Sequence, residues 1–248
     1  MNPFIPLQKS VIPACDVDSL SKLGQLLAAT DSIDGIGAYK VGFRLAIRGL
    51  AQAVNMIKRA APDKPVIFDG QKFGNDIPDL GPEFVGDLAS CGVDAVIIFP
   101  FAGPETQRVW TEACMKKGLH VIVGGEMTHA KFLYSDGGYV HDRAPTEMYS
   151  IGVAMGVRDF VVPGNNPKKV WKYRQLIEHL CADTDEKQYR LKAPGFVSQN
   201  GDITETGKVA GDYWDAIVGS AIYKKESVEA MREAAVRLVT QIRAPMPA

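Results

Sequence analysis

Charged side chains that could do chemistry recur among apolar residues in the first third of the sequence. They are Asp16, Lys40, Asp69, Lys72 and Asp76. Lys40 interrupts an apolar run, where an unpaired ammonium group would cost several kcal/mol or lose its proton. We therefore expect Lys40 to pair with carboxylates, with Asp69 and Asp76 as the obvious partners. Such alternating charges either stabilise charge that develops during a reaction or form a structural ion-pair network.

The elements that must position these groups follow a regular alternation. Short apolar runs, several of them β-branched, alternate with longer amphipathic stretches, such as 19–27 and 228–242, which is typical of repeated βα units around a parallel sheet. The eight expected strands are 11–15, 39–43, 65–69, 95–99, 121–124, 160–163, 189–193 and 216–219. No Ser/Gly linker or charge run divides the chain, so we expect residues 1–248 to form one domain.

Eight alternations in 248 residues favour an α/β fold of the (β/α)8 TIM-barrel type. The main alternative is an open dinucleotide-binding sheet, but no Gly-x-Gly-x-x-Gly follows the first expected strand. In a barrel, the active site lies at the C-terminal ends of the strands. Asp16 and Asp69 stand at such ends, so the charged residues are predicted to meet at one rim.

Composition excludes several other classes of function. The chain carries 28 Lys+Arg against 29 Asp+Glu, so no basic surplus points to nucleic acid or anionic lipid. The apolar run 95–102 is far shorter than the roughly 18 residues of a membrane span, and the N-terminus lacks a secretory-signal pattern. The four cysteines form no Cys-x-x-Cys pair and the four histidines no paired ligand spacing. We expect a cytoplasmic protein without a metal site.

Six segments, in order, resemble one known family. They are PACD, YKVGF, FDGQKFGNDIP, GEMTH, PGFVSQNGD and VGSAIY, and they run from about residue 11 to residue 223. Together they resemble the orotidine 5′-phosphate decarboxylase family, whose core motif is Asp-x-Lys-x-x-Asp-Ile. In this chain one extra residue lies on each side of Lys72, so the chain looks like a divergent member.

The resemblance implies a function and a set of site residues. The function is cofactor-independent conversion of orotidine 5′-phosphate to uridine 5′-phosphate and CO2 in pyrimidine biosynthesis. Lys40, Asp69, Lys72 and Asp76 would form the catalytic tetrad. The implied substrate-binding residues are Asp16 at the ribose, Thr128 and Gln199 near the base, and Ile77, Pro194, Gly219 and Ser220. The family is dimeric, so Asp76 would enter the site of the partner subunit.

One feature of the family is missing. The family has an arginine directly after the glycine of the last strand, where it clamps the substrate phosphate, whereas this chain has Ser220 after Gly219. A serine supplies only a hydroxyl and a backbone N–H, not a bidentate cation.

Two alternatives stay open at this level. One is a magnesium-dependent sugar-phosphate decarboxylase or aldolase of the same superfamily, such as 3-keto-L-gulonate 6-phosphate decarboxylase or hexulose phosphate synthase. Those relatives carry a glutamate where this chain has Lys40. The other is a barrel that binds nucleotides without catalysis, which the missing arginine would suit.

Overall fold

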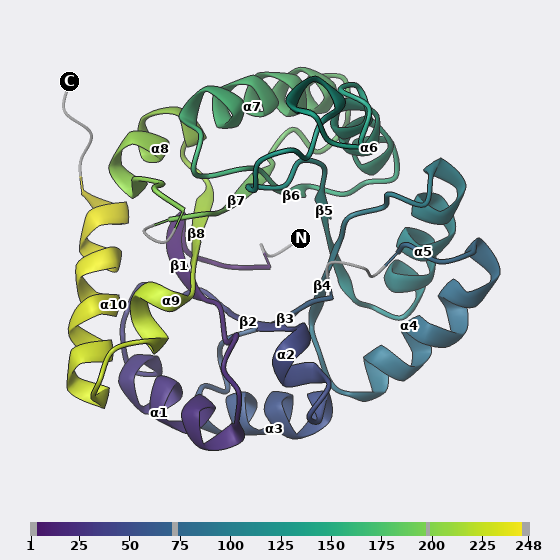
Figure 1. Ribbon diagram of the computed structural model, residues 1–248. Coiled ribbons are helices and arrows are strands. Elements are labelled where there is room, and N and C mark those ends of the chain that lie inside the picture. The colour runs from purple at the N-terminus through teal and green to yellow at the C-terminus, as the bar shows by residue number, and fades with distance from the viewer. Residues whose placement is uncertain (1–3, 71–73, 197–198, 245–248) are drawn as a thin grey trace.

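Eight parallel strands close into a barrel in the computed structural model, which describes residues 4–70, 74–196 and 199–244 (Figure 1). The strands are β1 (Lys9–Pro13), β2 (Tyr39–Gly42), β3 (Val66–Asp69), β4 (Ala95–Ile98), β5 (His120–Gly124), β6 (Asp159–Val161), β7 (Arg190–Pro194) and β8 (Trp214–Val218). Neighbours in sequence pair in parallel from β2 to β8, and β1 pairs with β8. Parallel bridges from Val11 to Ile36 and from Ala14 to Lys40 join β1 to the β2 segment and close the ring. The predicted (β/α)8 barrel is confirmed.

Each strand overlaps its predicted range; β1 and β8 begin two residues early, and β6 ends two residues early. Ser10 and Asp215 are the second residues of β1 and β8, and both are fully buried. Ser10 donates a hydrogen bond to Asp215 across the β1–β8 pair, at 2.5 Å. A pattern of apolar residues misses such strand ends, because polar side chains satisfied by each other can also be buried.

Helices surround the barrel (Figure 1). They are α1 (Leu20–Thr30), α2 (Phe43–Ala46), α3 (Leu50–Ala60), α4 (Gly81–Ser90), α5 (Pro104–Lys116), α6 (Ala144–Ala154), α7 (Pro167–Ala182), α8 (Ile203–Ala210), α9 (Ser220–Tyr223) and α10 (Val228–Arg243), with short 3-10 turns η1 (Pro78–Leu80) and η2 (Tyr134–Asp136). Ser19 and Ser227 cap the two helices expected at 19–27 and 228–242 by accepting backbone N–H groups. Within the described residues, no helix combines the length and apolarity that crossing a membrane requires.

Two apolar layers hold the barrel together. The larger lies between strands and helices, where outward-facing residues such as Val11, Val41 and Val96 meet the helices. The smaller fills the barrel with inward-facing residues, including Ile12, Ile67, Ile97, Ile122 and Ile217. The alternation follows from the strand period of two, which sends successive side chains to opposite faces.

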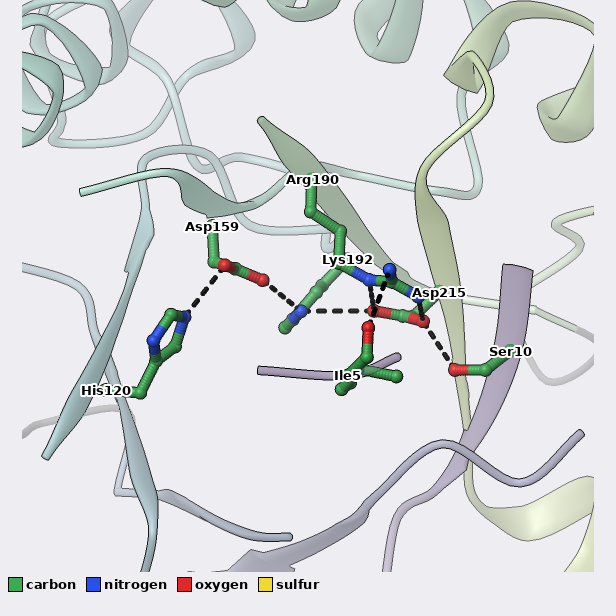
Figure 2. A network of polar contacts seen from close by, with 7 residues as sticks. All are labelled: Ile5, Ser10, His120, Asp159, Arg190, Lys192 and Asp215. Atoms are coloured by element: carbon green, nitrogen blue, oxygen red, sulfur yellow. Dashed lines mark hydrogen bonds and ion pairs between the residues drawn. The ribbon is translucent and has the colours of Figure 1, made fainter. Parts of the chain in front are cut away.

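A buried polar network fills the end of the barrel where the strands begin (Figure 2). Arg190 donates to both oxygens of Asp215, at 2.6 and 2.5 Å. Lys192 lies 3.1 Å from Asp215 and also pairs with Asp159, whose other oxygen bonds His120 at 2.8 Å. Two cations thus balance two carboxylates, which is the condition under which charges can be buried.

The N-terminal segment covers this network. Phe4 stacks on the His120 ring at 4.4 Å between ring centroids, and the carbonyl of Ile5 accepts a hydrogen bond from Arg190 at 3.4 Å. Ile5 is 1% exposed, and Figure 2 shows it beside Arg190, Lys192 and Asp215. This end of the barrel is therefore closed, so a ligand must enter from the other end.

Candidate active site

A cavity of about 230 Å³ opens at the C-terminal ends of the strands, opposite the buried network. Residues from loops after β1, β5, β7 and β8 meet there with side chains on β2 and β3. Its wall includes eight of the residues expected from the sequence: Asp16, Lys40, Asp69, Thr128, Pro194, Gln199, Gly219 and Ser220. The tertiary structure therefore brings together groups spread over some two hundred positions of the chain.

Among the described residues, Lys40 and Asp69 form the most buried ion pair of this cavity. Their charged atoms lie 2.8 Å apart, and the side chains are 7% and 9% exposed. Burial opposes the charged form of Lys40, but attraction by Asp69 and Asp16 outweighs it and raises the pKa of Lys40 above its ordinary value. Lys40 thus stays protonated at neutral pH. Asp69 Oδ1 is buried and accepts no hydrogen bond from any described residue.

Asp16 is the second carboxylate beside Lys40, at 3.5 Å, and its side chain is 41% exposed at the cavity mouth. Asp76, the other expected partner, does not pair with Lys40 within the described residues of this chain. The approach of Asp16 depends on Gly42 in β2, because a Cβ atom there would lie 2.0 Å from Asp16 Oδ1. The glycine therefore makes room for the carboxylate.

Cys15 lies next to Asp16 and is fully buried. Burial, and to a lesser degree the neighbouring Asp16 carboxylate, raise the pKa of its thiol to about 12. The thiol is therefore protonated at neutral pH and is a poor nucleophile.

Polar groups from the loops after β5, β6 and β7 meet around Thr128 and Gln199, which line the cavity. Asn165 donates from its side chain to the carbonyl of Thr128 at 3.0 Å. Gly195 has φ +106°, and a Cβ atom there would lie 3.1 Å from each of Asn165, Gln199 and Thr128. These residues therefore pack tightly around a position that only glycine occupies without strain.

The end of β8 leads through Gly219 and Ser220 into the short helix α9, and Tyr223 at its end also lines the cavity. Among the described lining residues, Lys40 is the only cation. The described part of the wall thus offers a hydroxyl and backbone N–H groups at Ser220.

Three expected residues are not part of the described wall. Asp76 is exposed, and its carboxylate accepts the backbone N–H of Ile77 at 2.7 Å. Ile77 is 58% exposed, and neither residue lines the cavity of its own chain. Lys72 lies outside the described residues.

Two further polar lining residues were given no role by the sequence. Tyr223 ends the segment VGSAIY, and Glu126 stands in the segment GEMTH. Glu126 is 2% exposed and bonds Lys169 and Tyr173, both on α7. A charged residue two positions after an apolar strand was the available signal, but its partners, more than forty positions away, were not apparent.

A second cavity of about 430 Å³ adjoins the first and shares Met127 and Thr128 with it. Asn165 and Lys169 line its other side, so the Glu126–Lys169 pair stands between the two cavities. Among the described residues, no three His, Cys, Asp or Glu side chains gather as a possible metal site.

Fold and cavity together define a (β/α)8-barrel protein with a charged site at the C-terminal rim. No protein-family model matches the chain. An orotidine 5′-phosphate decarboxylase of Methanosarcina barkeri is 30% identical over 222 residues, 88% of this chain and 89% of that protein. The one of Methanosarcina mazei is 29% identical over 214 residues, 85% of this chain and 86% of that protein.

A solved structure supports the same relationship at the level of the fold. The crystal structure of orotidine 5′-monophosphate decarboxylase from Methanocaldococcus jannaschii, complexed with inhibitor BMP, superposes with a TM-score of 0.80 at 19% identity. The match covers 95% of this chain and 99% of that chain. The chain belongs to the orotidine 5′-phosphate decarboxylase family, as the six sequence segments predicted.

Proposed function

We propose that this protein decarboxylates orotidine 5′-phosphate to uridine 5′-phosphate and CO2 in de novo pyrimidine biosynthesis, without a metal or organic cofactor. The observation that carries the proposal is the buried Lys40–Asp69 pair, which shares a cavity with Thr128, Gln199 and Ser220 in a chain of this family. Lys72 and Asp76 complete the catalytic group in this proposal.

The chemistry calls for a cation beside the reacting carbon. When the bond between the ring and the carboxylate breaks, its electron pair stays on the ring carbon, in the ring plane, where the π system cannot delocalise it. Lys72 stabilises this carbanion and then donates a proton to it, while CO2 departs. Asp69 lies beside the reacting carboxylate, and Lys40 holds Asp69 in place through the 2.8 Å ion pair.

Magnitudes show that one cation is insufficient. A charge pair at about 4 Å with an effective dielectric constant of about 20 contributes roughly 4 kcal/mol. Enzymatic accelerations require about 8–23 kcal/mol. The rest comes from binding energy at the ribose and phosphate, which fixes the substrate carboxylate beside Asp69. Asp16 contacts the ribose, and Thr128 and Gln199 contact the base.

The phosphate lies at the end of β8 in this proposal. Gly219 and Ser220 offer backbone N–H groups and one hydroxyl there, and the amide of Gln199 approaches from the preceding loop. This recognition lacks the bidentate guanidinium of the family. We therefore expect weaker phosphate binding than an arginine would give.

The proposed enzyme is a homodimer in which Asp76 acts in the partner's site. Large apolar side chains are exposed on η1, α2 and α4 and beside them: Phe43 at 53%, Ile47 at 73%, Ile77 at 58%, Leu80 at 43% and Phe84 at 49%. An apolar surface of this kind is typical of a protein interface. Because Asp76 directly precedes Ile77, a partner that covers this surface would meet Asp76.

The direct test is CO2 release from orotidine 5′-phosphate. We expect the wild-type protein to be active in the presence of EDTA and Lys72→Ala to lose at least about 10³-fold in kcat, the equivalent of the roughly 4 kcal/mol above. Uridine 5′-phosphate binding, measured by calorimetry, should persist in the variant. Full activity of Lys72→Ala would refute the assigned roles.

The same measurements separate the alternatives. Activity lost in EDTA and restored by Mg²⁺ would indicate the sugar-phosphate enzymes. Tight binding of uridine 5′-phosphate without turnover would indicate a binding protein without catalysis. This alternative was left open because Ser220 stands where the family has an arginine.

A further inference from the structure

Glu126 is a buried carboxylate on the cavity wall that the proposed mechanism does not use. It is 2% exposed, and both of its oxygens are bonded: Oε1 by the Lys169 ammonium and Oε2 by the Tyr173 hydroxyl. The two partners are four residues apart on α7, so they project from the same face of that helix. Glu126 therefore ties the end of β5 to the first turns of α7.

Lys169 and Tyr173 both carry the protons that they need to donate to the Glu126 carboxylate. Burial opposes the charge on Lys169, but the hydrogen bond and the attraction to Glu126, together with Asp136, outweigh burial and raise the pKa of the lysine. Burial, and then the bond to Glu126, raise the pKa of Tyr173. Both groups thus stay protonated and donate to the carboxylate at neutral pH.

The wall that carries Glu126 also carries the residues expected to contact the base. Thr128 follows two positions later and is held by the hydrogen bond from Asn165, which precedes α7. Both residues pack with Gln199 around Gly195. A shift of the β5 end against α7 would therefore move Thr128 relative to Gln199.

We infer that Glu126, clamped by Lys169 and Tyr173, is a positioning residue that keeps Thr128 in the position relative to Gln199 that binding of the nucleobase requires. The inference rests on the proposed function, which places the base at these two side chains. Glu126 acts through its neighbours, because its two oxygens are already occupied. Breaking the clamp leaves a buried carboxylate short of a partner, which is strongly unfavourable and moves the strand end.

The test uses two variants and one matched control. Lys169→Met removes the cation and keeps the length of the side chain, and Tyr173→Phe removes one hydroxyl and keeps the packed ring. Asp136→Asn is the control, because Asp136 is the other carboxylate near Lys169, at 3.7 Å and 52% exposed. An exposed pair of this kind contributes little.

We expect Lys169→Met to raise both KM and the dissociation constant of uridine 5′-phosphate about tenfold, with kcat nearly unchanged, since base contacts act equally in ground and transition states. Tyr173→Phe should shift both in the same direction by about threefold, and Asp136→Asn should match wild type. A merely structural role predicts the opposite pattern, in which kcat and the binding stoichiometry fall while KM and the dissociation constant stay constant. That pattern would overturn the inference.

The wild-type protein separates this inference from the proposed function. If wild type binds uridine 5′-phosphate but releases no CO2, the proposed reaction fails, while the affinities of the variants still test the clamp. If wild type neither turns over the substrate nor binds the nucleotide, both are overturned.

Discussion

At the scale of single residues, the site is defined by how charge is compensated in a closed space. Lys40 retains its proton although it is buried, because Asp69 and Asp16 lie 2.8 and 3.5 Å away. Removing one partner of a buried ion pair costs about 3–5 kcal/mol of folding stability, because the other charge is left unpaired. Both charges of the Lys40–Asp69 pair are therefore needed together. Asp69 lines the cavity in which the proposed mechanism places the reacting group, and its Oδ1 atom accepts no hydrogen bond from any described residue.

Ser220 gives a prediction at the same scale. Ser220→Arg should tighten uridine 5′-phosphate binding about tenfold, because a guanidinium forms charge-assisted, bidentate bonds to phosphate worth about 1.5–3 kcal/mol. Uridine, which has no phosphate, is the control ligand, and its affinity should not change. Calorimetry with both ligands makes the measurement. An equal gain for uridine would show that residue 220 does not meet the phosphate.

At the scale of elements, strand β2 sets the geometry around Lys40. Its last residue, Gly42, lies against the Asp16 carboxylate, and α2 begins directly afterwards. The strand thus supplies the cation and also the space for the second carboxylate. Both depend on the strand period of two, which places residues 40 and 42 on the same face.

Gly42→Ala should uncouple Asp16 from Lys40 without unfolding the barrel. The new Cβ would lie 2.0 Å from Asp16 Oδ1, and the end of this side chain can swing away towards solvent. We expect kcat/KM to fall by tenfold or more, since a hydrogen bond to a charged group contributes about 1.5–3 kcal/mol. Gly86→Ala on α4 is the matched control, because a Cβ there meets nothing within 4 Å. A wild-type kcat/KM in Gly42→Ala would argue against a ribose contact by Asp16.

At the scale of the whole molecule, the barrel separates a closed polar end from an open end that carries the candidate site. The network of Arg190, Lys192, Asp159 and Asp215 joins β6, β7 and β8 where they begin, and the N-terminal segment covers it (Figure 2). Burial opposes the charge on Asp159, but Lys192 and His120 outweigh it and lower the pKa of its carboxyl.

This network predicts acid sensitivity of the fold. A carboxyl with a depressed native pKa stabilises the folded state above its unfolded pKa of about 3.9, and this contribution is lost as pH falls further. Urea unfolding between pH 7 and 2.5 should show stability declining below about pH 4. Asp159→Asn should be less stable by about 3 kcal/mol at pH 7 and show a shallower decline. Asp63→Asn, at an exposed position, should follow the wild-type profile; an equal loss there would contradict the prediction.

The proposed dimer makes a prediction at the same scale. Lys40→Ala and Asp76→Ala should each be inactive alone. If Asp76 acts in the partner's site, mixing them under subunit exchange restores one intact site per mixed dimer, or about one quarter of wild-type activity at random pairing. Light scattering should show a dimer throughout. Activity that stays absent after confirmed exchange would place Asp76 in the site of its own chain.

The sequence by itself determined the number and order of the strands, because apolar periodicity and strand ends are local properties of the chain. It also singled out Lys40 and Asp69, since a lysine inside an apolar run demands a carboxylate partner. The six ordered segments were sufficient to indicate the family.

Only the tertiary structure decided which distant groups meet. It paired Lys40 with Asp16 as well as Asp69, placed Asp76 on the surface, and joined Glu126 to Lys169. It also buried the network at the closed end. Each of these contacts links residues far apart in the chain, and closure of the barrel alone sets their distances. Side-chain type and spacing along the sequence indicated that Lys40 needs a carboxylate and that strand-end residues share one rim, but they do not determine those distances.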